Sequence, residues 1–356
     1  MDAKGLSRRQ FLRWLVPLTG VIGSGAFWGA LSGCQQPQAS TVATKPVSTD
    51  TPGSMPTPVP SSTTTKPSST AATVALTSTP AAPMSTSSSQ LTLVVVKGGT
   101  PQSLVRAAMD AMGGMGRFVK KGQWVVIKPN IGFAMEPEYA ATTNPELLVM
   151  LIKLCQEAGA RSVEVFDNPV ASLNTAYQVS GIEEAVKSAG AQMVRMSRLK
   201  FKDTPIPRGK AIRSWLIYED ALNADVLINV PIAKHHNLAG LTLAMKNLMG
   251  VCGSNRGGFH QSIGQCLADV ATVVPVSLTV IDAVRILTRN GPTGGNLADV
   301  KKLDTIIVST DMVAADSYAA TLFGLKGTDL SYVTTGLEMG LGQADYRKLP
   351  MREVQL

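Results

Sequence analysis

The sequence predicts an α/β fold for residues 90–356, with a mainly parallel sheet flanked by helices. Short β-branched apolar runs alternate with helical segments along this span, as in sheets built from strand–helix–strand units. One run, 224–232, is apolar almost throughout, which is typical of a strand buried on both faces. No linker-like stretch interrupts the span, so we expect a single domain.

Each element is expected from its local pattern. The expected strands are apolar runs that stop near a glycine, a proline or a polar residue: 91–98, 123–130, 162–167, 191–196, 224–232, 276–284 and 304–310. The expected helices are 103–112, 144–160, 181–190, 238–250 and, as the final long one, 312–324. Asn144 can cap the second helix, and Pro145 suits its first turn. Residues 198–222 break the alternation and predict an antiparallel hairpin inserted at one edge of the sheet.

The first 34 residues predict export and membrane anchoring. Ser7–Leu12 resembles a twin-arginine signal, with both arginines and the following Phe-Leu in place. The apolar run 14–31 is near spanning length, so a transmembrane anchor is the alternative, but its many small residues and basic front favour a targeting segment. Leu31–Cys34 resembles a bacterial lipobox, which implies lipidation of Cys34. The expected partners are therefore the twin-arginine translocase and a membrane.

Residues 35–89 predict a disordered tether, because 34 of these 55 residues are Ser, Thr or Pro. Such a segment offers little apolar surface to offset the entropy of ordering the chain. With the signal before it, the tether predicts an exported protein, lipid-anchored to the cell membrane or the outer membrane. Its folded domain would face the periplasm or the outside.

Charge and cysteine usage argue against two classes of function. The formal charge is +8, but residues 1–89 carry six basic and two acidic side chains, which leaves about +4 for the rest. No basic run with interleaved aromatic residues occurs, so nucleic acid is not an expected partner. Cys155, Cys252 and Cys266 form no C-x-x-C motif, which makes an iron–sulfur cluster or a zinc ribbon unexpected. Cys155 fits a helix core, whereas a disulfide between the other two is left open.

Polar side chains follow several expected strands at the point where each strand ends. In open α/β sheets, ligands bind beyond the carboxyl ends of the strands, so we expect these side chains to share one rim. They are Lys128, Asn130, Asp167, Asn168, Asn229, Lys234, His235, His236, Asp282 and Asp311. Lysines favour anions, while histidines and aspartates can bind a divalent metal or move protons.

The expected helix 238–250 returns Lys246 and Asn247 to this rim. Adjacent helical side chains diverge by about 100°, so we expect only one of the two to point inward. A solvated helix face is the alternative for Lys246. For His235 and His236 the alternative is a loop histidine bonded to the backbone.

Two glycine-rich loops, 253–262 and 289–296, are candidates to complete the site. Their glycines could let backbone amides approach an anion, and a flexible surface loop is the alternative for each. The candidate ligand-binding residues in them are Arg256, His260, Gly291 and Gly294. Neither loop places G-x-G-x-x-G after a strand, and H-E-x-x-H and G-x-S-x-G are absent. Dinucleotide binding, zinc peptidases and α/β-hydrolases are therefore disfavoured.

The motifs together resemble a known family. "VVIKPNIG", "TTNPELL", "EVFDNP", "ADVLINVPIAKHH", "LTLAMKNLMG", "VIDAV", "GPTGG" and "IIVSTDMVAADSYAATLFG" occur in this order. They resemble the bacterial and archaeal family catalogued as domain of unknown function 362, over about residues 91–345. Many members carry ferredoxin-type cysteine motifs, which this chain lacks. The resemblance implies functional, and as candidates catalytic, roles for Lys128, Asn130, Lys234, His236, Lys246 and Asn247.

These observations predict an enzyme or a redox accessory protein with an anion or metal–anion site at the strand-end rim. The remaining candidate ligand-binding residues are Asp167, His235, Arg256, His260, Asp282, Gly291 and Gly294. A small anion is the expected ligand and a divalent metal is a candidate cofactor. The alternative is a non-catalytic lipoprotein that captures an anionic solute. A purely structural surface protein would leave the charged strand ends unexplained.

Overall fold

The structure is a computed structural model that describes residues 90–356. The twin-arginine motif, the lipobox with Cys34 and the tether lie outside the described residues, so these remain predictions. Within residues 90–356, no helix combines the length and the apolar character needed to cross a bilayer.

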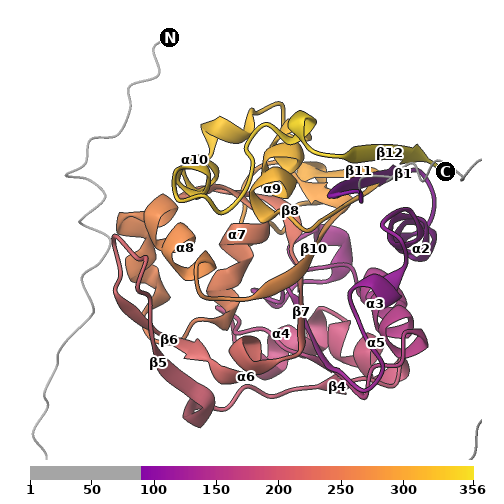
Figure 1. The fold of residues 1–356 in the computed structure, drawn as a ribbon, viewed down its shortest axis with the longest axis horizontal. Coiled ribbons are helices and arrows are strands. Elements are labelled where there is room, and N and C mark those ends of the chain that lie inside the picture. The colour runs from indigo at the N-terminus through magenta and orange to yellow at the C-terminus, as the bar shows by residue number, and fades with distance from the viewer. Residues whose placement is uncertain (1–89) are drawn as a thin grey trace, which may run out of the picture. The chain divides into compact units, whose positions relative to one another are not determined.

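A ten-stranded mixed sheet runs through the described part of the chain (Figure 1). Its main path is β12-β1-β11-β10-β7-β2-β3-β4, and β8 and β9 pair beside β10. The strands are β1 (Leu93–Lys97), β2 (Trp124–Pro129), β3 (Ser162–Val165), β4 (Gln192–Met193), β7 (Val226–Val230), β8 (Ile232–His236), β9 (Gly240–Thr242), β10 (Val276–Leu287), β11 (Val300–Ser309) and β12 (Met351–Gln355). Six of the nine strand pairs are parallel, which confirms the predicted mainly parallel sheet.

Helices cover both faces of this sheet, as Figure 1 shows. One layer of helices packs against an apolar core on one face of the sheet. It consists of α2 (Pro101–Ala111), α3 (Pro145–Glu157), α4 (Leu173–Val179) and α5 (Ile182–Ser188). The other layer packs against a second apolar core on the opposite face. It consists of α6 (Glu219–Asn223), α7 (Ala244–Asn247), α8 (Ile263–Ala271), α9 (Met312–Thr321) and α10 (Ser331–Glu338). The predicted start of α3 is confirmed, because the Asn144 side chain accepts a hydrogen bond from the amide of Glu146.

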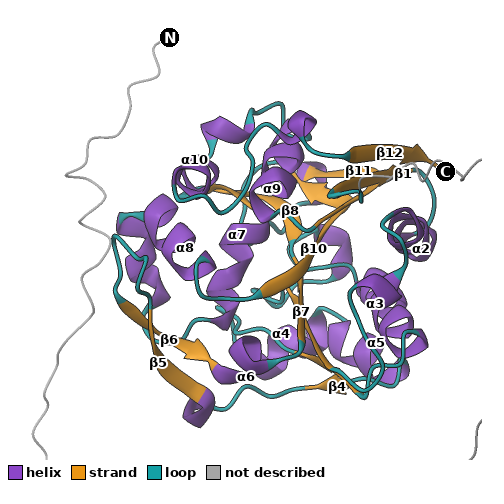
Figure 2. Cartoon of the chain, in the orientation of Figure 1, coloured by secondary structure: helices purple, strands orange, loops and turns teal. Residues whose placement is uncertain are grey.

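The predicted hairpin is present, but it does not extend the main sheet. Strands β5 (Phe201–Pro205) and β6 (Ser214–Tyr218) form a separate antiparallel sheet (Figure 2). The ring of Tyr218 packs edge-on against Phe166, with 4.9 Å between centroids. This aromatic contact ties the hairpin to the segment that follows β3.

The expected carboxyl-end rim is only partly correct, because one strand runs in the opposite direction and another extends beyond its expected end. Strand β11 runs antiparallel to β10, so its carboxyl end points away from those of β2, β3 and β7. Asp311 therefore does not join the rim, and its side chain instead caps α9 by accepting from the amide of Ala314. Asp282 lies inside the long strand β10 rather than at its end.

The segment expected as a loop followed by a long helix is largely a β-hairpin. Residues of β8 pair with β9 in antiparallel register, with Lys234 opposite Thr242. The chain turns through Gly240, whose positive φ of 73° favours glycine. Only α7 and the 3₁₀ turn Leu248–Val251 remain of the predicted helix 238–250. Apolar residues at helical spacing were misleading here, because cross-strand pairing overrides local propensity.

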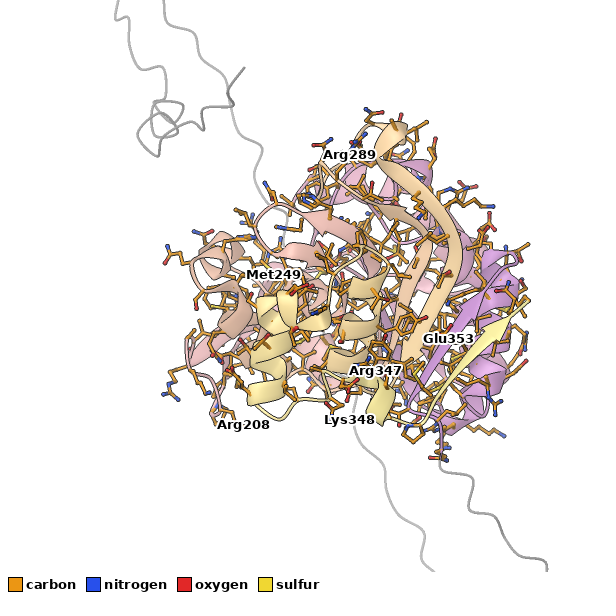
Figure 3. The ribbon with its side chains drawn as sticks, turned by 90° about the horizontal axis from the view of Figure 1, so that it is seen from above. Arg208, Met249, Arg289, Arg347, Lys348 and Glu353 are labelled. Carbon is orange, nitrogen blue, oxygen red and sulfur yellow. The ribbon has the colours of Figure 1, made fainter. Side chains whose placement is uncertain are left out.

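The C-terminal region also departs from the expectation. The predicted helix 312–324 is α9, but α10 follows it, so it is not the final helix. Strand β12 then pairs in parallel with β1 at one edge of the sheet. Glu353 of β12, labelled in Figure 3, accepts a hydrogen bond of 2.6 Å from Lys97 of β1. This edge pairing joins the two ends of the described chain.

Candidate functional site

A cavity of about 490 Å³ lies where the loops after β2 and β3 meet the β8–β9 hairpin and α7. The structure brings ten of the predicted rim and site residues to its lining: Lys128, Asn130, Asp167, Asn168, Lys234, His236, Lys246, Asn247, Arg256 and His260. Met249, labelled in Figure 3, lines it as well. Basic and imidazole groups that are remote in the sequence thus meet in one cleft, because the carboxyl ends of parallel strands share an edge of the sheet.

Four predicted ligand-binding residues do not line this cavity. The Asp282 carboxylate accepts hydrogen bonds from the amides of Asn144 and Val284, at 2.7 and 3.0 Å, so it holds the start of α3 instead. His235 accepts from the amide of Gly291 at 3.1 Å, which is the alternative role expected for a loop histidine. Gly291 and Gly294 belong to a loop that contributes Pro292, but neither glycine, to the lining.

Lys128 and Asp167 form a fully buried ion pair at the base of the cavity. The Lys128 Nζ lies 2.8 Å from the Asp167 Oδ1 and also donates to the carbonyl of Pro129 at 2.8 Å. Asp167 accepts further hydrogen bonds from the amides of Ile131 and Asn168, at 2.6 and 3.0 Å. Burial lowers the pKa of Lys128, and the carboxylate of Asp167 opposes that shift. The charges of Lys128 and Asp167 therefore neutralise each other within the protein.

Gly250 makes room for this ion pair. A Cβ at position 250 would lie 1.8 Å from the Asp167 Oδ1 and 2.5 Å from the Lys128 Nζ. The carbonyl of Gly250 also accepts a hydrogen bond of 2.9 Å from the amide of Asn168. No sequence pattern predicts this role, since the contact joins three separate segments.

A relay of buried side-chain amides supports the cavity from below. Asn130 donates to the Oδ1 of Asn247 at 2.9 Å, and Asn247 donates to the Oδ1 of Asn229, also at 2.9 Å. Asn229 in turn donates to the carbonyl of Ala244 in α7 at 2.9 Å. Asn229 thus acts beneath the cavity rather than at its surface. Because each amide has a partner, the relay fixes β2, β7 and α7 relative to one another.

Lys234 joins the same relay. Its Nζ donates to the Oδ1 of Asn130 at 3.2 Å and to the carbonyl of Ala141 at 2.5 Å, and it lies 4.9 Å from the ring centroid of Phe133. Burial is the main cause that lowers the pKa of Lys234 to about 7, and repulsion from Lys246 adds to it.

Lys246 differs from the other two buried lysines. It is 9% exposed and lines the cavity, yet within residues 90–356 its ammonium has neither a hydrogen bond nor an ion pair. Burial lowers its pKa to about 8, and the charges of Arg256 and Lys128 contribute to that shift. The expectation that only one of Lys246 and Asn247 faces inward is wrong, because α7 is a single turn and both line the cavity.

A carboxylate that sequence reasoning missed holds α7 in place. Asp316, which is fully buried in α9, accepts hydrogen bonds from the amides of Ala244 and Met245 at 2.6 and 3.0 Å. These are two of the amides that a helix start leaves without partners. A lone aspartate in the apolar run of α9 was the available signal, because such a residue is rarely buried without a polar partner.

Two histidines stack at one side of the cavity, with 5.6 Å between the ring centroids of His236 and His260. His236 accepts from the amides of Leu238 and Ala239 at its Nδ1, both at 3.2 Å, which assigns its proton to Nε2. The Nδ1 of His260 lies 3.1 Å from the carbonyl of Gly257, which assigns that ring's proton to Nδ1. The pair therefore combines one Nε2–H donor with one Nε2 acceptor.

Both histidines are held neutral. Burial lowers the pKa of His236 to about 3 and also lowers the pKa of His260, and Lys246 adds repulsion in each case. The Nε2 of His260 is buried and has no hydrogen-bond partner among the described residues. A buried acceptor of this kind is a place where a ligand can donate a hydrogen bond.

Arg256 adds a fourth cation whose charge is not balanced. Its Nη1 donates to the carbonyls of Asn168 and Met249 at 2.7 and 3.0 Å, and its Nη2 donates to the carbonyl of Pro169 at 3.0 Å. The lining thus holds three lysines and one arginine against a single carboxylate, that of Asp167. Low-dielectric walls strengthen such a field, so this cavity favours an anion.

The described residues contain neither a grouped set of metal ligands nor a disulfide. Among residues 90–356, no three His, Cys, Asp or Glu side chains are grouped so that they could hold a metal ion. Cys155, Cys252 and Cys266 are all buried free thiols, so the disulfide left open between the last two is not formed.

Comparisons with known proteins place this fold and site in a family. The family described as Domain of unknown function (DUF362) matches residues 125–321, which is more than half of the chain. The thylakoid-associated protein sll1697 of Synechocystis sp. (strain ATCC 27184 / PCC 6803 / Kazusa) is 25% identical over 252 residues, covering 68% of this chain and 76% of that protein.

One solved structure, the lactate racemase apoprotein from Thermoanaerobacterium thermosaccharolyticum, shows a distant likeness. It has 12% sequence identity and a TM-score of 0.39, over 61% of this chain and 54% of that one. The chain thus spans about half the length of that structure. The resemblance expected from the sequence motifs is confirmed by the family match, and the chain belongs to the DUF362 family.

Proposed function

We propose that the cavity binds a small organic or inorganic anion and is the active site of an enzyme or of a redox accessory protein. One observation carries the proposal: Lys246 is buried in the lining without a protein partner, beside Arg256 and in a cavity whose single carboxylate is already paired. Burying an unpaired charge is costly, so an ammonium in this position calls for an anionic partner.

The two stacked histidines support catalysis rather than binding alone. His236 presents a donor and His260 an acceptor, and both rings are neutral at pH 7. The unpartnered Nε2 of the neutral His260 ring can take a proton from a ligand beside it and return that proton later. Lys246 lies close enough to both rings to affect their pKa values. The site therefore combines anion binding with groups that can move a proton.

Anion binding is tested on the full-length chain by titration calorimetry with oxalate and with inorganic phosphate. We expect Lys246→Met to weaken the affinity about tenfold or more, since a hydrogen bond to a charged group contributes about 1.5–3 kcal/mol. Lys153→Met removes an exposed lysine of α3 and should leave the affinity unchanged. Equal affinities in all three proteins, or no binding of either anion, would overturn the proposal.

The location of the protein is part of the same proposal. The twin-arginine motif and the lipobox support export and attachment to a membrane through Cys34, and residues 35–89 would then act as a tether. The name of the Synechocystis relative, a thylakoid-associated protein, agrees with membrane association at a coarse level. Cys34→Ser should move the protein from the membrane fraction to the soluble fraction of cells, and an unchanged distribution would exclude the lipid anchor.

The second candidate is a lipoprotein that captures an anion without converting it. The predicted tether favours it, because a long polar segment would display the folded domain at a distance from the membrane. Turnover separates the candidates: an enzyme converts an excess of ligand over protein, whereas a capture protein depletes only one equivalent.

A further inference from the structure

Lys246 is the only one of the three buried cavity lysines that the described residues leave without a partner. Lys128 is paired with Asp167, and Lys234 donates to the protein at two acceptors. Asp167 cannot serve both Lys128 and Lys246 equally, because its two oxygens are already occupied by Lys128 and by backbone amides. The surroundings of Lys246 are thus positive, with Arg256 and Lys128 as its charged neighbours.

Such surroundings favour the neutral amine. Neighbouring cations and removal from water both disfavour an ammonium, which is how lysines become nucleophiles in proteins. Here both causes act together, and they lower the pKa of Lys246 to about 8. The backbone that carries Lys246 is held in place, since the single turn of α7 is capped by Asp316 and joined to the asparagine relay. A positioned neutral amine is suited to attack a carbonyl carbon.

We propose that the Nζ of Lys246 forms an imine with the carbonyl group of an oxo acid bound in the cavity. The inference rests on the proposed anion site and names its substrate class. An oxo acid offers a carboxylate for the positive lining and a carbonyl carbon for the amine. A cavity of about 490 Å³ accommodates a molecule of this size.

The step balances without an oxidant or a reductant. The nitrogen lone pair forms a C–N bond, and the carbonyl π electrons move to oxygen, which takes up a proton. Loss of the remaining nitrogen proton and departure of that oxygen as water then leave a C=N bond. The unpartnered Nε2 of His260 can receive the proton lost by the nitrogen and return it to the departing oxygen, while the Nε2–H of His236 donates a hydrogen bond to that oxygen.

Reductive trapping tests the imine. The full-length chain is incubated separately with glyoxylate, pyruvate and 2-oxoglutarate in the presence of sodium cyanoborohydride, and intact mass and peptide mapping locate any adduct. We expect one reduced adduct per chain, on Lys246, with at least one of the three acids. We expect the adduct to be lost in Lys246→Arg, which keeps the positive charge, and kept in Lys153→Met.

The outcomes separate this inference from the proposed function. An oxo acid or oxalate that binds without any trapped adduct on Lys246 would overturn the imine and leave the anion site standing. Absence of both binding and trapping would overturn both. Trapping that is unchanged in Lys246→Arg, or spread over exposed lysines, would be non-specific labelling and would also overturn the inference. Thermal unfolding of Lys246→Arg checks that the variant is folded.

Discussion

Two walls of the same cavity differ in whether their polar groups have partners within the protein. In the paired wall, formed by Lys128, Asp167, Lys234 and Asn130, the charged and amide groups contact one another or the backbone. In the open wall, formed by Lys246 and His260, the Nζ and the Nε2 have no partner among the described residues. The paired groups stabilise the fold, whereas the unpartnered groups are available to a ligand.

The largest expected effect is on the paired wall. Lys128→Met should lower the free energy of unfolding by about 3–5 kcal/mol, because it leaves the Asp167 carboxylate buried and unpaired. Urea unfolding measures this loss. The double variant Lys128→Met with Asp167→Asn removes both charges and should recover part of the stability. A single variant as stable as the wild type would show that the ion pair does not support the fold.

A smaller loss is expected from filling the space beside that ion pair. Gly250→Ala places a Cβ within 1.8 Å of the Asp167 Oδ1, so side chains must shift, at a cost of about 1–3 kcal/mol. The matched control is Gly116→Ala, where an added Cβ meets no atom within 4 Å. Thermal unfolding of both variants measures the difference, and equal melting temperatures would contradict the close packing.

The charge of Lys246 in the open wall should make anion binding depend on pH. The pKa of Lys246 is lowered from 10.5 to about 8, so its ammonium is present below pH 8 and is lost as pH rises through that value. Oxalate, whose charge is constant over this range, should therefore bind more weakly above pH 8 than below it, and loss of the Lys234 charge near pH 7 adds an earlier step. Titration calorimetry from pH 6 to 10 measures the curve, from which Lys246→Met should remove the step near pH 8.

The smallest effect is expected when the open wall loses its lysine. Lys246→Met should not lower the free energy of unfolding, because it removes a buried ammonium that has no protein partner to lose. Comparison with Lys128→Met under the same urea conditions sharpens the contrast between the walls. A loss of several kcal/mol in both variants would mean that the two lysines are equally structural.

The sequence could predict much of this site because parallel strands bring their carboxyl ends together. Lys128 lies near the carboxyl end of β2 and Asp167 follows the neighbouring strand β3, so their meeting required only strand order. The same reasoning was wrong for Asp311, because an apolar strand pattern does not reveal whether the strand runs parallel or antiparallel. Likewise, the two glycine-rich loops look equivalent in sequence, yet only 253–262 contributes a charged residue, Arg256, to the lining.

Taken alone, the sequence determined the α/β class, most strand positions and the family, because hydrophobic periodicity and short motifs are local features. Long-range contacts were needed to establish that residues 232–242 form a hairpin, that α7 is a single turn capped by Asp316, and which lysines find partners. These outcomes depend on the direction and register of strands distant in the chain. A buried charge is paired or left free by contacts between such segments, and local sequence does not encode those contacts.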